Sequence, residues 1–427
     1  MILRLLLANA LELVTGLGVV SALGAPLGTS YLAGLAVVGI VSAHLALVDV
    51  GVGWIGLGVL AALGAAVTVR GRAWRSWRAP RPSVWAAAGL AALAALFVRA
   101  WPTFAAKPLD DYDGWAMWGM KAKALAELGW ADPALFAAKS AGSLHLDYPL
   151  LLPSLDAVAS RAMGGFDPRT IHLQFLLDAV AAFAAFASLL RDRVPAWLLW
   201  PWLVALGFAP ALSGQLLTAY ADVPLALFVA AGLLSAARWV RDRDVRTLAL
   251  AALFLAAAAL TKNEGAIFAA AAYFGLLLAT RCWRRLLVAV AATELVLLPW
   301  QVWLHVYDVH SDTLLGLDAL RVRHPGIAPL AVHGLLDRAG SLDDWPLLLP
   351  FFVLAVVAAV GTRVAVFAWA WALVSLLGLA WIYVVSKLEW SNYFAFSGNR
   401  VVDSVIVGTA ALTPLLTAEA LRKIAPP

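Results

Sequence analysis

Charged residues are scarce in this chain: Asp, Glu, Lys and Arg make up only 13% of 427 residues, against 63% hydrophobic residues. A soluble domain carries about 25% charged residues, so the polar side chains here are too few to cover a water-soluble fold. The apolar segments run without polar alternation, which excludes a membrane β-barrel. Cys282 is the single cysteine, so no internal disulfide can form. The composition therefore predicts an all-α integral membrane protein.

Apolar runs long enough to cross a bilayer recur along the whole chain. A scan for runs of about 18–22 residues predicts about 13 transmembrane helices in a single polytopic membrane domain, residues 1–427. Their approximate limits are 4–24, 31–48, 53–69, 83–101, 170–190, 195–210, 222–240, 247–262, 265–280, 286–306, 346–361, 364–385 and 401–418.

The chain has a net charge of +5, and many of its basic residues cluster in short loops between apolar runs. This clustering indicates the orientation of the chain in the membrane, so we expect no nucleic-acid partner. Counting helices places these loops on one side, which the positive-inside rule makes cytoplasmic, with the N-terminus outside. The basic residues on this side are Arg70, Arg72, Arg75, Arg78, Arg81, Arg191, Arg193, Arg238, Arg241, Arg243, Arg246, Arg281, Arg284, Arg285, Arg363, Arg422 and Lys423.

Three longer hydrophilic stretches fall on the opposite, external face: 102–169, 307–345 and 386–400. The first contains a segment, 115–130, whose apolar residues recur at helical spacing, with Lys121 and Lys123 expected off the apolar face. A second short helix is expected within 154–163. Helices of this kind lie in the membrane interface. The pair is expected to border a groove at the external surface, where an activated substrate has to arrive attached to a lipid.

Five polar groups on the external face could carry chemistry. Each contains ionisable side chains close to the end of an apolar run, where they are costly to place unless they are paired or used. The groups are Asp110, Asp111 and Asp113; His145, Asp147 and Tyr148; Asp222; Lys262, Asn263 and Glu264; and Arg400.

Four of these groups also have a purely structural interpretation. Asp113 and Asp222 both precede predicted helices, where a carboxylate can cap the free N–H groups. Lys262 and Glu264 could form an ion pair within a tight turn. Arg400 could extend its side chain to the membrane surface without a ligand. The convergence of five separated segments on one face favours a functional site over five unrelated caps and turns.

Four segments resemble the polytopic bacterial glycosyltransferases of the GT-C superfamily, which include protein O-mannosyltransferases and aminoarabinose transferases. These segments are DGWAMWGMKAKAL (Asp113–Leu125), YADVPLALF (Tyr220–Phe228), LTKNEG (Leu260–Gly265) and LPWQVW (Leu298–Trp303). The resemblance covers roughly residues 83–418. It implies a GT-C-like fold in the bacterial inner membrane. It also implies transfer of a sugar from a polyprenyl-phosphate donor to a glycan, lipid or protein acceptor at the external face of the cell envelope.

The acidic residue that this family carries in its first long external loop corresponds best to Asp113, with Asp110 and Asp111 as neighbouring candidates. A carboxylate there could take the proton of an acceptor hydroxyl as the sugar carbon is attacked. With one Asp as the general base, we expect the transfer to invert the configuration at the anomeric carbon. The phosphate leaving group needs positive charge, for which the candidates are Lys262, Arg400 and Lys121. The candidate substrate-binding residues are Asp222, Glu264, Asn263, His145, Asp147 and Tyr148.

Two questions of cofactor and class stay open at this stage. Asp222 and Glu264 could bind sugar hydroxyls, position Lys262 or hold a divalent ion, and a metal is also an alternative at His305, Asp308, His310 and Asp312. A transporter or flippase for a lipid-linked or small anionic substrate is the alternative function. It would use acids inside the spans, such as Glu12, Asp178 and Glu294, which could instead form buried hydrogen bonds. No pair of related halves, typical of transporters, is evident. A non-catalytic membrane scaffold would leave the acid-rich loops without a role.

Overall fold

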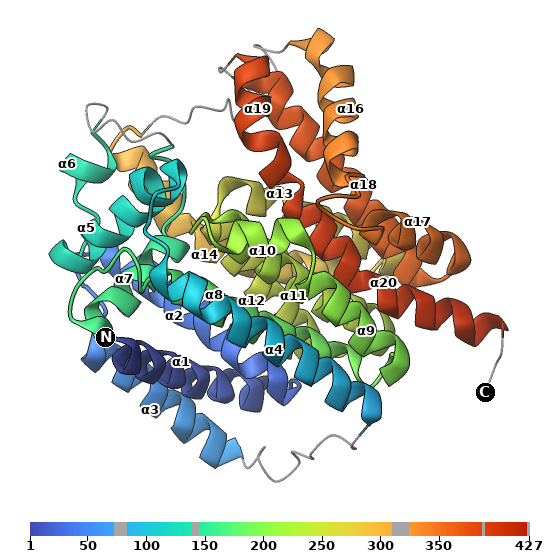
Figure 1. Ribbon diagram of the computed structural model, residues 1–427, viewed down its shortest axis with the longest axis horizontal. Coiled ribbons are helices and arrows are strands. Elements are labelled where there is room, and N and C mark those ends of the chain that lie inside the picture. Colours follow the sequence, from blue (N-terminus) through green and yellow to red (C-terminus); the bar gives the residue numbers. More distant parts are fainter. Residues whose placement is uncertain (72–82, 139–144, 310–323, 387–388, 425–427) are drawn as a thin grey trace.

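A computed structural model describes residues 1–71, 83–138, 145–309, 324–386 and 389–424, and every regular element in these ranges is a helix (Figure 1). Ten helices are long and apolar enough to cross a membrane, or up to eleven if one bent helix pair forms a single span. The prediction of an all-α, multi-pass membrane protein is therefore confirmed. The figure of thirteen spans stays a prediction.

The long helices follow the predicted apolar runs closely. They are α1 (Ile2–Leu23), α2 (Ser30–Ala46, extended at its start by η1, Leu27–Thr29), α3 (Trp54–Gly71), α4 (Val84–Ala106), α8 (His172–Leu190), α11 (Asp222–Asp242), α13 (Asn263–Thr280), α14 (Trp283–Val306), α18 (Arg363–Val385) and the joined pair α19 (Trp390–Val401) and α20 (Asp403–Ile424).

The remaining three predicted spans differ in form from the rest. Two of them are shorter apolar helices, α12 (Val245–Thr261) and α17 (Leu348–Ala358). The third is bent by 54° between α9 (Ala196–Gly207) and α10 (Pro210–Leu216). Proline at the start of α10 lacks the N–H group that would continue the preceding helix, which accounts for a break at this point.

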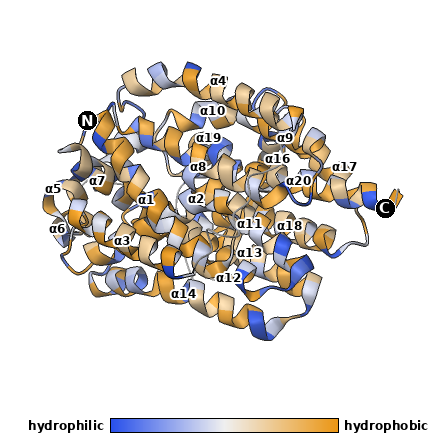
Figure 2. Cartoon of the chain, turned by 90° about the horizontal axis from the view of Figure 1, so that it is seen from below, coloured by the Kyte–Doolittle hydropathy of each residue, from blue (hydrophilic) through white to orange (hydrophobic). Residues whose placement is uncertain are grey.

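Helices α11 and α20 form the centre of the bundle. In α11, and in the joined α19–α20 span, 94% of the residues in the apolar 18-residue stretch are buried. Small residues let the central helices approach closely: a Cβ atom on Gly232 would lie 2.9 Å from Leu255, and one on Gly408 would lie 2.4 Å from Trp371. Close approach through small residues is typical of helix packing in membranes. In the peripheral α4, only 11% of the residues in the corresponding stretch are buried. Figure 2 shows the largely hydrophobic residues of the outer helices.

The first long loop folds into four short helices. They are η3 (Gly114–Gly119, a π-helix), α5 (Met120–Leu128), α6 (Pro133–Phe136) and α7 (Leu151–Met163). The expected helix over 115–130 is present, but the expectation that Lys121 lies off its buried face is wrong: Lys121 is 4% exposed. Nearly every residue of α7 is buried, in contact with α5 and α2. This helix is therefore part of the core.

The described part of the second long loop, 307–345, contains η5 (Pro325–Ile327) and α16 (Ala328–Ala339). Helix α16 packs against α18 and α19, and Figure 1 shows α16 and α19 projecting together from one end of the bundle. The region 310–323 is outside the described residues.

Several arginine-bearing turns meet at one end of the bundle. Arg193, after α8, forms an ion pair with Asp242 at the end of α11. Arg241 pairs with Glu419 of α20 at 2.9 Å, and Arg422 donates a hydrogen bond to the carbonyl oxygen of Arg193. Among the arginines expected at this end, Arg72, Arg75, Arg78 and Arg81 lie outside the described residues. We call this region the arginine end.

Candidate functional site

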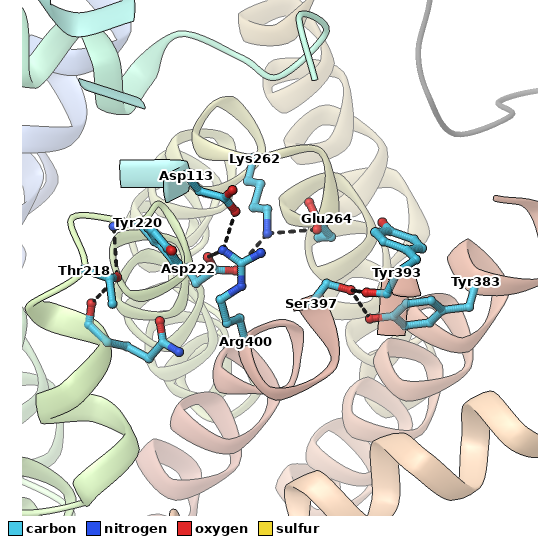
Figure 3. A network of polar contacts seen from close by, with 11 residues as sticks. Asp113, Thr218, Tyr220, Asp222, Lys262, Glu264, Tyr383, Tyr393, Ser397 and Arg400 are labelled. Carbon is cyan, nitrogen blue, oxygen red and sulfur yellow. Dashed lines mark hydrogen bonds and ion pairs between the residues drawn. The ribbon is translucent and has the colours of Figure 1, made fainter. Parts of the chain in front are cut away.

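Five charged side chains from four separate parts of the chain meet in one ionic network (Figure 3). Lys262 Nζ lies 2.8 Å from Asp222 Oδ1 and 3.1 Å from Glu264 Oε1. Arg400 Nη1 lies 2.5 Å from Asp113 Oδ2 and 4.0 Å from Asp222 Oδ2. The predicted convergence of these segments is therefore present, and the network carries two cations and three carboxylates.

Asp113 enters the network at the start of the π-helix η3. Its side chain makes no capping hydrogen bond, so the capping interpretation does not hold, and its carboxylate accepts a hydrogen bond from Arg400. The next residue, Gly114, lies so close to the chain before α11 that a Cβ atom would be 2.3 Å from the carbonyl oxygen of Thr218. Glycine at this position lets the Asp113 backbone approach α11. Single π-helical turns occur frequently at functional sites.

Helix α12 ends and α13 begins at Lys262, because the backbone of this residue is extended, with φ −157° and ψ 152°. The following turn is tight, because a Cβ atom on Gly265 would lie 2.0 Å from the carbonyl oxygen of Ala258. The LTKNEG segment thus combines a helix break with a glycine that allows α13 to fold back on α12. As a result, Lys262 and Glu264 face Asp222, which lies in the first turn of α11.

The Lys262 pair is almost completely buried: the side chains of Lys262 and Asp222 are 7% and 3% exposed. Burial lowers the pKa of Lys262, but the carboxylates of Asp222 and Glu264 outweigh this effect, so its pKa is raised above the ordinary value. The ammonium group therefore stays charged. Burying a charge is costly unless it is paired, and these two carboxylates supply the pairing.

Arg400 has an aromatic partner as well as its acidic ones. Its guanidinium carbon lies 4.6 Å from the centre of the Tyr220 ring, a favourable distance for a cation–π contact. Burial raises the pKa of Tyr220, so the ring stays a neutral phenol beside the guanidinium. Because Arg400 is held by groups from η3 and α11, it is not a side chain merely extended to the membrane surface.

The other two acidic candidates near Asp113 lie outside the network. Asp110 and Asp111 both pair with Lys107, at 2.5 and 2.6 Å. The hydrogen bond from Lys107 lowers the pKa of the exposed Asp110. The sequence left Asp110, Asp111 and Asp113 as candidates for the catalytic carboxylate. Of these three, only Asp113 contacts Arg400.

The loop that carries His145, Asp147 and Tyr148 lies beside the network. Asn263 donates a 2.7 Å hydrogen bond to Asp147 Oδ2, and Lys262 Nζ lies 5.6 Å from the centre of the Tyr148 ring. The His145 and Tyr148 rings are stacked, with centroids 4.7 Å apart. Asp147 Oδ1 is buried with no hydrogen-bond partner among the described residues, which leaves an acceptor available to a ligand.

Lys121 supports this loop from beneath. Its ammonium group donates hydrogen bonds to the carbonyl oxygens of His145, Leu146 and Tyr148. Burial lowers the pKa of Lys121 to about 8, with Asp147 acting in the opposite direction. Lys121 is thus placed to position the loop, and no phosphate-binding contact follows from its geometry.

Several neighbours of the network were not predicted from the sequence. Asp403 begins α20 just after Arg400, is 1% exposed, and neither carboxylate oxygen has a partner among the described residues. Tyr383 and Ser397 form a 2.8 Å hydrogen bond, and the Tyr383 ring contacts that of Tyr393 with centroids 5.0 Å apart. Figure 3 shows this aromatic group beside Glu264.

The structure does not assemble a metal site from protein side chains within the described ranges: no three His, Cys, Asp or Glu residues there are grouped to hold an ion. Two members of the sequence cluster proposed for a metal, His310 and Asp312, lie outside those ranges. A divalent ion at Asp222 and Glu264 therefore stays an untested alternative.

Comparison of the chain with protein-family models, with curated proteins and with solved structures gave no match.

Proposed function

We propose that this protein is an integral membrane glycosyltransferase that moves a sugar from a polyprenyl-phosphate donor to an acceptor hydroxyl at the external face. The observation that carries the proposal is the ionic network of Asp113, Arg400, Asp222, Lys262 and Glu264. It places an acid, an arginine and a lysine at one point, which a transfer from a phosphate leaving group requires. The GT-C resemblance of the same segments supports this assignment.

The contact between Arg400 and Asp113 suggests how donor binding and catalysis are linked. A phosphate oxygen is a strong partner for a guanidinium group, so the donor would compete with Asp113 for Arg400. Release from Arg400 would leave the Asp113 carboxylate available to the acceptor. The base would thus become active only when the donor is bound.

The transfer itself would proceed by displacement at the anomeric carbon. The acceptor oxygen forms a bond to that carbon as the bond to the phosphate oxygen breaks, and the proton of the acceptor hydroxyl passes to Asp113. Polyprenyl phosphate leaves with its additional negative charge stabilised by Arg400 and Lys262. With a single base and attack from the opposite side, the product has the inverted configuration.

The test is sugar transfer by the purified protein in proteoliposomes, supplied with radiolabelled polyprenyl-phosphate sugars and cell-envelope extract as acceptor. We expect Asp113→Asn to lower transfer by 10²-fold or more, the usual order of magnitude for a general base. Asp110→Asn is the matched control, because Asp110 is a neighbouring carboxylate that pairs with Lys107 outside the network. Full transfer by the Asp113 variant would remove the base from the proposal.

A transporter or flippase is the alternative, and one observation favours it. A buried polar cluster joins α1 and α8 through hydrogen bonds between Asn9 and Gln174 and between Gln174 and Asp178. Nearby, Glu12 Oε2 is buried with no partner among the described residues, and acids of this kind occur along ion pathways. Movement of a labelled polyprenyl-phosphate sugar across the bilayer without transfer, abolished by Glu12→Gln, would support this alternative.

A further inference from the structure

The arginine end contains a cavity that the proposed function does not use. It has a volume of about 590 Å³ and lies where the turn between α13 and α14 meets the end of α11 and the start of α18. Its lining includes Arg243, Arg281, Arg284, Arg285 and Arg363, together with Trp283. A cavity of this size accommodates a small ligand or a lipid headgroup, and the ligand it favours is an anion.

The arginines of this cavity differ from Arg193 and Arg241 at the same end in having no acidic partner in the described part of the chain. Within the described ranges, no carboxylate forms an ion pair with any of the five, whereas Arg193 pairs with Asp242 and Arg241 with Glu419. The contacts that do occur are to neutral groups. Arg243 lies 3.6 Å from Cys282 Sγ, and Arg285 donates a 3.0 Å hydrogen bond to the Arg243 carbonyl oxygen. The positive charge of the cavity is therefore not neutralised by these parts of the protein.

The backbone provides a second, independent observation. Arg243 and Arg281 are the C-terminal caps of α11 and α13, with φ of 58° and 57°. Glycine is the usual residue at such a left-handed cap, because a side chain there is strained. Arginine occupies both caps, and both side chains line the same cavity. Strained non-glycine positions are found at ligand sites, and here the strain is consistent with a use for the two guanidinium groups.

The cavity adjoins apolar surface of the kind that contacts acyl chains. Leu277 and Leu278 in the last turn of α13 are exposed, as are Leu287 and Val288 near the start of α14. Trp283 is exposed between them, and tryptophan is enriched where a membrane meets water. A ligand with a phosphate at the cavity and hydrocarbon chains along α13 and α14 would match both parts of this surface.

We propose that this cavity binds the phosphate headgroup of an anionic phospholipid whose acyl chains lie along α13 and α14. Basic pockets between membrane helices are known to hold anionic headgroups. The site is separate from the ionic network, and the inference stands whether or not the protein transfers sugars.

The test is a titration of the delipidated protein in detergent with phosphatidylglycerol, followed by native mass spectrometry. Phosphatidylcholine serves as the zwitterionic comparison. The variant Arg281→Gly/Arg284→Gln should bind phosphatidylglycerol about 25-fold more weakly, since each arginine near a lipid headgroup contributes roughly fivefold. Its melting temperature should not fall, because glycine suits the cap at position 281.

The matched control is Arg191→Gln/Arg246→Gln, which removes the same charge from exposed positions at this end that do not line the cavity. We expect its affinity to change less than twofold. An equal loss in the control, or equal binding of phosphatidylcholine, would overturn the assignment. Inorganic phosphate at millimolar concentration should not displace the lipid; if it does so and also binds with the lipid's affinity, the site belongs to a soluble phosphate compound.

Discussion

The two ends of the helix bundle use cations in different ways. In the ionic network, Lys262 and Arg400 are each held by carboxylates from other helices and are largely buried. At the arginine end, four of the five cavity arginines are exposed and Arg243 is half-buried, and no acid within the described ranges forms an ion pair with them. A paired, buried cation fixes a geometry, whereas an unpaired, exposed cation is available to an anion from outside.

This difference indicates what a ligand would have to displace at each end. A phosphate that bound Arg400 in the network would have to compete with Asp113, so its binding would be coupled to a rearrangement of side chains. A headgroup at the arginine end would have no paired carboxylate to displace within the described ranges. The first arrangement would suit the proposed transfer, in which the base waits for the donor, and the second would suit the proposed binding of a lipid headgroup.

The largest expected effect comes from removing the buried cation. Lys262→Met should lower the free energy of unfolding by about 3–5 kcal/mol, because it removes the cation paired with the buried Glu264 and leaves the buried Asp222 only its 4.0 Å contact with Arg400. At the arginine end, Arg241→Met breaks the more exposed pair with Glu419 and should cost at most about 1 kcal/mol. Thermal and denaturant unfolding in one detergent measures both. Equal losses would erase the distinction between the two ends.

A smaller effect is expected for the shape of the cation in the network. Arg400→Lys keeps the charge but loses the guanidinium fork, so affinity for a polyprenyl-phosphate sugar should fall about 10- to 100-fold, corresponding to about 1.5–3 kcal/mol for a hydrogen bond to a charged group. Arg281→Lys at the other end should leave that affinity unchanged. Isothermal titration with the donor measures both variants, and unchanged binding by Arg400→Lys would count against the phosphate role.

The backbone of the network should be sensitive to a single methyl group. Gly265→Ala places a Cβ atom 2.0 Å from the Ala258 carbonyl oxygen and should cost about 1–3 kcal/mol, the usual range for overpacking. Gly214→Ala is the control, because nothing lies within 4 Å of the added atom. Melting temperatures of the two variants test this, and an equally stable Gly265 variant would show that the turn can relax.

A further expected effect is a pH dependence from Lys121. Its pKa in the folded protein is about 8, lower than in the unfolded chain, so the unfolded state binds more protons between about pH 8 and 10. Stability should therefore rise with pH across this range. The rise should be absent in Lys121→Met, and unfolding at several pH values compares the two. A wild-type slope of zero or of opposite sign would contradict the assigned burial effect.

The fold could be predicted largely from the lengths of apolar runs, because each bilayer-spanning helix has to satisfy its own backbone hydrogen bonds. Runs such as 222–240 therefore became helices near their predicted limits. Hydropathy does not report how two helices join, so the bend before Pro210 and the continuity of α19 with α20 were missed. Hydropathy also placed Lys121 on the wrong face, since its carbonyl partners come from a loop 24 or more residues away.

The candidate site was predictable where polar residues interrupt apolar runs. Lys262 and Asp222 stand out in this way, and their meeting follows from their positions at adjacent helix ends. Asp403 was missed, although an acid beginning a long apolar run is a comparable signal. The separation of Asp113 from Asp110 and Asp111 was not predictable, because it depends on Lys107 pairing with the latter two in three dimensions.

We expect the ionic network to lie toward the outside of the cell and the arginine end to face the cytoplasm. Two single-cysteine variants in a Cys282→Ala background test it most directly. Tyr112→Cys lies at an exposed position next to Asp113, and Arg191→Cys lies at the arginine end. In right-side-out membrane vesicles, a membrane-impermeant maleimide should label the first at once and the second only after the membrane is opened. Labelling of both from the outside, or of Arg191→Cys alone, would contradict the account.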